Sequence, residues 1–326
     1  MVNSILENTK RSQEIKALLD GSGFSKEIGL AVIDLKEKEP KIFGHHLDLF
    51  IYPASVYKIF IGAEVLRRIE IGEFSLEKIL TVTFPNDVDK DLKMFPGRSR
   101  KLLTAGEEVT IEYLLDLMLS ESDNTASNIL IDLVGCENIN KNIIDKYNWQ
   151  GSGVTRKFLD RTKEDKKYRW SETTMTCARH VAEFFWLVEN EKLISPFVSR
   201  KLKEYMMKWN REGNKPLCIA EYTLGYHKGG YLENNFYALF YSSYYKKSGF
   251  ALDYAVQGIL KLIKNIFTKG YAFIRWVNDA GVVEGKNSHY VIAFFSVSRQ
   301  FNPRKRFPTE KLAKLVYDYM EKSIKI

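Results

Sequence analysis

The chain lacks any uninterrupted apolar stretch close to the roughly 20 residues that a membrane-spanning helix needs. It also has little cysteine, with three in 326 residues, which favours no disulfide framework. None of the cysteines has metal-ligand spacing with any of the five histidines. We therefore expect no membrane span, no metal and no organic cofactor, and we interpret Cys136, Cys177 and Cys218 as free, mostly buried thiols.

The N-terminus lacks a basic region followed by a long apolar run, so the chain as given carries no secretory signal. We expect either that the protein works inside the cell or that a signal has been removed. A net charge of +8 modestly favours anionic partners. The densest basic cluster, Arg304-Lys305-Arg306, lies in an expected loop without a nucleic-acid-binding motif, so we predict no binding to nucleic acid.

Three short, widely separated segments carry groups suited to acyl transfer. They are Ser55-Val56-Tyr57-Lys58, Ser122-Asp123-Asn124 and Lys228-Gly229-Gly230. A serine hydroxyl is a weak nucleophile unless a base lies within hydrogen-bond reach of it. Lys58 follows Ser55 by three residues, which at helical spacing puts both side chains on one face. Together the segments supply a nucleophile, proton-transfer groups and an anion clamp.

Context distinguishes Ser55 from the other serines that have a lysine three residues later. Ser55 follows Pro53 and opens an apolar run, which is a signal for the start of a helix. Its oxygen would then lie at the positive end of a helix dipole, beside backbone N–H groups. Ser75 and Lys78, in a polar turn, are interpreted as solvated. Ser122-Asp123-Asn124 precedes a second helical pattern, where we expect both helix capping and catalysis.

The order and flanks of the three segments resemble those of the class A β-lactamases, a family of penicillin-recognising serine enzymes. The likeness covers roughly residues 28–230 and 276–320. It includes the first core strand from Ile28, the start of the Ω-loop at Val154, and Asn278 to Val283, which resemble the strand that pairs with the Lys-Gly-Gly strand. The segments are specific in combination, although no single one would suffice.

The resemblance implies a role for each matching residue. Ser55 would attack a carbonyl to form an acyl-enzyme, with Lys58 as the base. Ser122 would relay a proton to the leaving nitrogen, and Asn124 would bind the acyl amide of the substrate. In and beside the third segment, Lys228 would attract the carboxylate of the substrate, and Gly230 and Tyr231 would line the binding site. The backbone N–H groups of Ser55 and Tyr231 would form the oxyanion hole.

Two departures from the family concern the substrate and the second half of the reaction. The family has a hydroxyl residue where this chain has Gly229, which offers no side chain to a substrate carboxylate. The family also activates the deacylating water with an Ω-loop glutamate that is followed by Leu-Asn. Here Lys163 or Glu164 falls at that position and no Leu-Asn follows, so Glu164 is either the catalytic base or a solvated surface residue.

The strand and helix patterns predict an α+β fold, with an antiparallel sheet built from both chain ends, flanked by terminal helices, and an all-helical subdomain inserted. This is the β-lactamase/transpeptidase-like arrangement. We assign 1–51 and 225–326 to the sheet subdomain and 52–224 to the helical one. The expected strands cover 28–35, 41–46, 225–231, 271–277 and 290–297, with a first helix ending near Gly21 and a last helix through Leu312 and Met320.

A segment without counterpart in the family, 236–270, predicts an extra helical insertion that either packs on the core or serves as a lid or dimer contact.

The sequence thus predicts a serine hydrolase that is acylated at Ser55 by a β-lactam or a related amide or ester. The alternatives are a slowly deacylating penicillin-binding peptidase or esterase, and a non-catalytic module that binds cell-wall fragments. The expected partner is a small-molecule substrate with an acyl amide or ester, and the expected state is a monomer or weak dimer.

Overall fold

The structure is a computed structural model that describes residues 5–22, 28–90, 102–159, 174–208, 224–234, 273–300 and 309–322. Glu164 and the predicted insertion at 236–270 lie outside these residues, as does Cys218.

Strands from the two ends of the chain form one antiparallel sheet in the described residues. In sheet order they are β2 (Ile42–His45), β1 (Ile28–Asp34), β7 (His289–Gln300), β6 (Phe273–Glu284) and β5 (Leu224–Asn234). The expected antiparallel sheet is confirmed, and β6 runs on to Glu284, so that Asn278 to Val283 pair with β5 as the resemblance implies. β1 is buried along almost its whole length, because helices cover both faces of the sheet.

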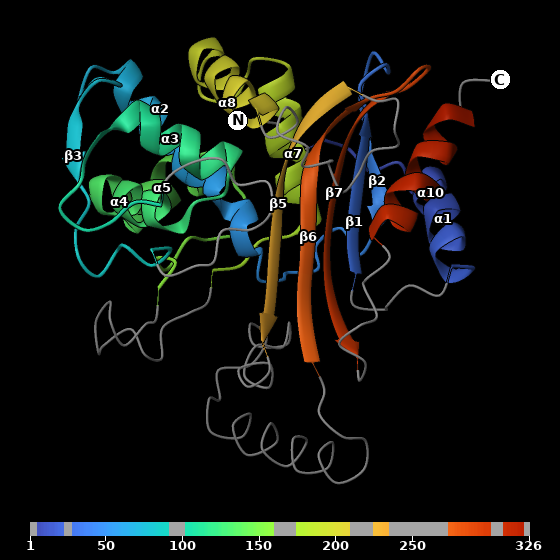
Figure 1. Cartoon of the computed structure of the whole chain (residues 1–326). Helices are drawn as coiled ribbons and strands as arrows, with labels where there is room; N and C mark the ends of the chain where they lie inside the picture. The colour runs from blue at the N-terminus through green and yellow to red at the C-terminus, as the bar shows by residue number, and fades with distance from the viewer. Residues whose placement is uncertain are drawn as a thin grey trace, which may run out of the picture.

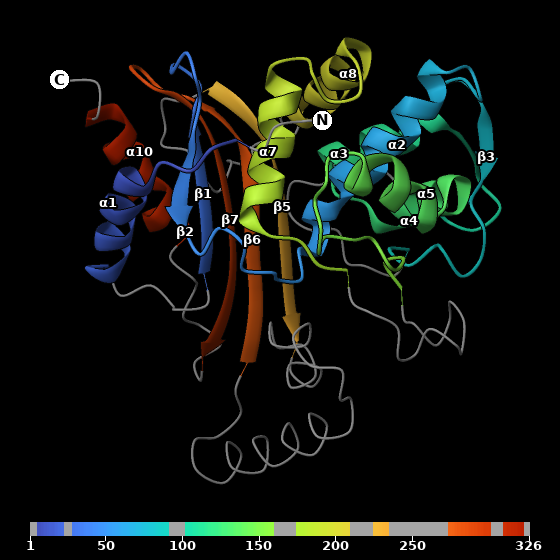
Figure 2. The same cartoon turned by 180° about the vertical axis from the view of Figure 1, so that it is seen from behind.

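The two terminal helices, α1 (Thr9–Asp20) and α10 (Thr309–Lys322), cover one face of the sheet (Figure 1). Their apolar side chains, including Ile15 and Leu312, pack with Leu30, Val32 and Phe294 of the strands. α7 (Ala178–Glu189) covers the opposite face, as the reverse view shows (Figure 2). None of the described helices is long and apolar enough to cross a membrane.

The segment between β2 and β5 is mainly helical and lies beside the β5 edge of the sheet (Figure 1). Besides α7 its described elements are η1 (Ala54–Tyr57), α2 (Lys58–Glu70), α3 (Ile111–Ser120), α4 (Asn124–Val134), α5 (Cys136–Ile139), the π-helix η2 (Asn140–Asp145), α8 (Pro196–Lys208), and a short pair of strands, β3 (Ile79–Thr81) and β4 (Glu108–Thr110). The strand pair was not expected, since three half-exposed residues in each strand give no periodic signal.

Arg11 of α1 joins the terminal helices to the sheet. Its guanidinium contacts the carboxylates of Asp34 at 3.2 Å and Glu37 at 2.9 Å, and its Nε donates to the hydroxyl of Tyr319 in α10. The same group lies over the ring of Phe43, 3.9 Å from its centroid. A guanidinium can make these contacts at once because it is planar and carries five N–H donors.

Two carboxylates of α7 lie in opposite electrostatic settings. Burial raises the pKa of Glu183, whose Oε2 accepts a hydrogen bond from Trp149 Nε1 at 2.8 Å. Burial also acts to raise the pKa of Glu189, but hydrogen bonds from His289, Lys203 and Tyr226 outweigh it and lower that pKa to about 2.

Replacing Glu183 with Gln should therefore stabilise the protein at neutral pH. A raised carboxyl pKa contributes stability below the unfolded value of 4.5, and that contribution is lost as the pH rises through the folded pKa. Glutamine does not ionise. The free energy of unfolding of Glu183→Gln, measured with urea over a pH series, should therefore exceed that of the wild type by an increasing amount as the pH rises above 4.5.

Glu189→Gln, on the same helix, is the matched control of opposite sign. It should lose on the order of 3 kcal/mol at pH values above 4.5, and the loss should vanish as the pH falls to about 2. Parallel pH dependences of the two variants would contradict this account.

Candidate active site

Ser55 lies in a tight turn between the sheet and the helical part of the chain. It belongs to η1, which leads directly into α2, and the preceding Ala54 has a φ of 48°, a conformation that L-residues adopt rarely and that clusters at functional sites. Asn278 of β6 holds the approach to this turn, because its Nδ2 donates to the carbonyl of Tyr52 at 3.0 Å. Strands β5 and β6 both contact η1.

Lys58, the first residue of α2, is completely buried. Its Nζ donates to the carbonyl of Ser122 at 2.6 Å and to Oδ1 of Asn124 at 2.8 Å, with Ser122 Oγ at 3.2 Å and the carbonyl of Asp123 at 3.3 Å. A buried ammonium needs such acceptors, since burial of an unpaired charge is costly. The first two predicted segments therefore meet at one nitrogen atom.

The Ser-Asp-Asn segment has a backbone that directs its groups toward Lys58. Ser122 adopts a φ of 60°, in the left-handed region, so the chain turns sharply between α3 and α4. Asp123 is the N-cap of α4, and its side chain accepts a hydrogen bond from the N–H of Ala126 at 2.8 Å. The expected helix cap is thus present, with Asp123 rather than Ser122 as the capping side chain.

Strand β5 brings the third segment to the same place. Lys228 is buried, and its Nζ donates to the carbonyl of Gly229 at 3.2 Å. Burial, and then the positive charge of Lys58, lower the pKa of Lys228 well below its usual value, while Asp279 acts in the opposite direction. The two lysines are therefore close enough to interact electrostatically.

Gly230 is required by the close approach of β5 to η1. A Cβ at this position would lie 2.6 Å from the carbonyl oxygen of Pro53, 2.8 Å from the nitrogen of Ser55 and 2.9 Å from that of Val56. The next residue, Tyr231, is 56% exposed, unlike the buried lysines. Glycine thus allows the strand to lie directly against the turn that carries the serine.

An aromatic residue that the sequence did not indicate, Phe158, lies beside Lys58. The ring of Phe158 stacks on that of Tyr57 with centroids 4.4 Å apart, and Lys58 Nζ lies 4.3 Å from the centroid of the same Phe158 ring. Asn128 holds this segment in place by accepting the N–H of Phe158 at 2.6 Å. An aromatic residue at the start of a polar loop carries no periodic signal that could have revealed it.

The structure thus places seven of the predicted site residues in one region, where β5 meets η1 and the ends of α2 and α4. They are Ser55, Lys58, Ser122, Asn124, Lys228, Gly230 and Tyr231. The eighth, Glu164, lies outside the described residues. Asp89 and Asn278, which hold Asn124 and Tyr52, were not predicted.

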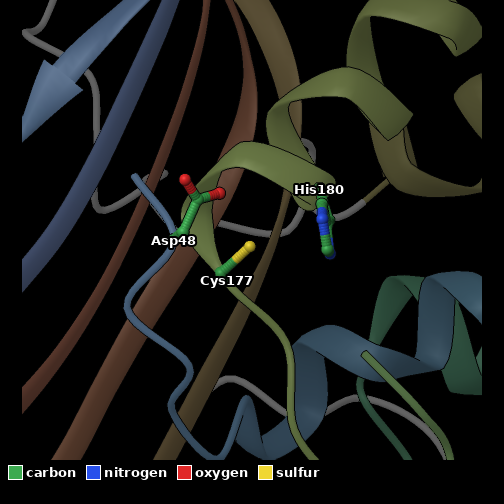
Figure 3. Close-up of side chains that lie close together, drawn as sticks. All are labelled: Asp48, Cys177 and His180. Atoms are coloured by element: carbon green, nitrogen blue, oxygen red, sulfur yellow. The ribbon is translucent and has the colours of Figure 1, made fainter. Parts of the chain in front are cut away.

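A second group of polar side chains comes from the start of α7 and the segment that follows β2. Asp48, Cys177 and His180 place potential metal-ligating atoms within 4.8 Å of one another at the start of α7 (Figure 3). The expectation that no cysteine has metal-ligand spacing with a histidine was therefore wrong for Cys177 and His180, which lie three residues apart. Their contacts argue against a metal, since Arg179 binds both oxygens of Asp48, at 2.7 and 3.0 Å, and His180 Nδ1 is 2.8 Å from Ser152 Oγ. Burial also raises the pKa of the Cys177 thiol to about 12, which disfavours the thiolate.

Solved structures with the same architecture define the fold. The chain is similar to PBP-A (19% identity over 97% of this chain and 98% of that one, TM-score 0.66). It is also similar to a β-lactamase from Chitinophaga pinensis DSM 2588 (18%, 96% and 99%, 0.67) and to the TLA-3 extended-spectrum β-lactamase (18%, 95% and 100%, 0.68). The fold is therefore β-lactamase/transpeptidase-like, as predicted.

The family of the chain follows from a match of its sequence to a family model. Residues 10–235 match the profile described as Beta-lactamase enzyme family, and the chain belongs to that family. The predicted resemblance is thereby confirmed. No curated protein matches the chain.

Gly230→Ala should destabilise the protein by about 1–3 kcal/mol, because the added methyl group would meet backbone atoms that cannot move independently. Gly21→Ala is the control: its nearest neighbour would be Ala17 O at 3.6 Å, and its φ of −72° suits alanine. That variant should change stability by less than about 1 kcal/mol. Urea unfolding measures both, and equal effects would refute the close approach of β5 to η1.

Proposed function

We propose that the protein is a serine hydrolase that is acylated at Ser55 by a β-lactam or a related amide or ester. The observation that carries this proposal is the position of Lys58, whose Nζ binds Ser122 and Asn124 of the second segment and interacts with Lys228 of the third. A lysine with only a structural role would need hydrogen-bond acceptors. It would not need a serine in the turn before its helix or a second lysine nearby.

In the proposed acylation, Ser55 Oγ forms a bond to the substrate carbonyl carbon while its proton passes to Lys58. The N–H groups of Ser55 and Tyr231 bind the resulting oxyanion. As the carbonyl group re-forms, the carbon–nitrogen or carbon–oxygen bond of the substrate breaks. Ser122 delivers its proton to the leaving atom and takes up the proton that Lys58 received from Ser55. Lys58 acts as the base in its neutral form. Like charges on Lys58 and Lys228 repel each other in this buried site, and burial together with this repulsion lowers the pKa of Lys228.

The second candidate is an enzyme that is acylated but releases the acyl group slowly, as a penicillin-binding peptidase or esterase does. Phe158 supports this second candidate, because its ring presents an apolar surface beside Lys58 Nζ. Such a surface offers no hydrogen bond to a water molecule that would attack the acyl group. The likeness to PBP-A supports it too, since a mutant of that protein is known as an acyl-enzyme complex with penicillin G. Hydrolysis of the acyl-enzyme would depend on a base such as Glu164.

The two candidates are separated by following hydrolysis of a chromogenic cephalosporin while the protein is trapped with a fluorescent penicillin. Turnover would indicate a β-lactamase, and a stable label without turnover would indicate a penicillin-binding enzyme. If neither signal appears and short esters and amides also fail, the protein is a binding module that keeps the fold without the chemistry.

Ser55→Ala should reduce labelling or turnover by at least about 10³-fold, because the acylated atom is removed. Ser75→Ala is the matched control, since Ser75 also has a lysine three residues later, Lys78, but both are exposed. It should behave as the wild type. Label that persists in Ser55→Ala, or that is lost in Ser75→Ala, would refute the assignment of the nucleophile.

A further inference from the structure

Asp89 is a buried carboxylate that belongs to none of the three segments. It lies in the loop after β3, is 3% exposed, and contacts the start of α4. Its Oδ2 accepts the backbone N–H of Asn124 at 2.7 Å, and its Oδ1 accepts from Asn124 Nδ2 at 3.0 Å. Its own N–H donates to Thr125 Oγ1 at 3.2 Å. The carboxylate therefore binds one residue through both its backbone and its side chain.

The side-chain amide of Asn124 is consequently held at both ends. Its oxygen accepts from Lys58 Nζ at 2.8 Å and its nitrogen donates to Asp89. Rotating the amide by 180° would place N–H donors against an ammonium and a carbonyl oxygen against a carboxylate, so both contacts would become repulsive. The charges on either side thus select one orientation, and one of the two N–H donors on Nδ2 is left for a ligand.

We propose that Asp89 is a positioning residue for acylation, which holds the amide of Asn124 so that its second Nδ2 hydrogen faces the acyl-amide carbonyl of a bound substrate. This inference rests on the proposed function. It also defines the substrates that depend on Asp89, namely those with an amide side chain next to the reacting carbonyl. A substrate without that amide makes no use of Asn124 Nδ2. Its acylation needs only the contact between Asn124 Oδ1 and Lys58 Nζ, which the lysine itself maintains when Asp89 is replaced.

The test compares acylation of Asp89→Asn and Asp89→Ala by two probes, benzylpenicillin, which has the side-chain amide, and penicillanic acid, which lacks it. Loss of a hydrogen bond to a charged group should slow acylation by benzylpenicillin about 10- to 100-fold. Acylation by penicillanic acid should change by less than about 2-fold, within the ±0.5 kcal/mol expected of uninvolved positions. Equal slowing with both probes, or no slowing, would overturn the proposal, since a merely structural role does not distinguish them.

Asp87→Asn is the matched control, because Asp87 is a buried carboxylate of the same loop whose partner is Lys90, at 2.9 Å, and not Asn124. It should lower the melting temperature without changing the ratio of the two acylation rates. A change of that ratio in Asp87→Asn as large as in Asp89→Asn would also overturn the proposal.

Hydrogen exchange at Asn124, measured by NMR on ¹⁵N-labelled protein, tests the positioning independently of acylation. In Asp89→Ala the backbone and side-chain N–H groups of Asn124 should exchange at least about 10-fold faster, in proportion to the lost hydrogen bonds. The N–H of Ala126, which Asp123 accepts, is the internal reference and should not change. If the wild type is acylated by neither probe, the proposed function fails. Separately, unchanged exchange at Asn124 in Asp89→Ala would overturn the positioning role.

Discussion

The buried ammonium of Lys58 is the constraint on which the arrangement of the site depends. A charge without access to water must be surrounded by oxygen acceptors, and four of them come from Ser122, Asp123 and Asn124, the last of which begins α4. The left-handed conformation of Ser122 follows from this demand, because it directs a main-chain carbonyl and a side chain toward the same nitrogen. The local strain is offset by the hydrogen bonds that it makes possible.

Much of the fold could be predicted because its elements have strong periodic patterns. The strands that begin at Ile28 and His289 and the helix that holds Leu312 are long enough to show their buried faces in the sequence. The bounds were less accurate, and β6 continues to Glu284, beyond the predicted strand end at 277, because pairing with β5 and β7 extends it. The assignment of 1–51 and 225–326 to one subdomain stays a prediction.

The site could be predicted only where a residue belongs to a recognisable segment. Ser55, Lys58, Ser122 and Lys228 are predicted as site residues from their order and flanks, whereas Asp89 has no such signal. Asp89 lies in a run of charged residues, and such a run is usually a solvated surface. Its partner is far away in the sequence, so only the folded chain shows that this carboxylate is buried. The same holds for Asn278 and Phe158, whose partners come from distant elements.

The pairing of β1 with β7 has a consequence for how the protein acquires its site during synthesis. Ala31 lies opposite Ala293, so the sheet cannot close until almost the whole chain has left the ribosome. α2, α3 and α4 contact one another at short sequence separation and can form earlier. Lys58 and Ser122 can thus meet in a nascent chain, while Lys228 and Gly230 arrive only with β5. The candidate site is therefore begun early in synthesis and completed late, when Gly230 packs against the turn that holds Ser55.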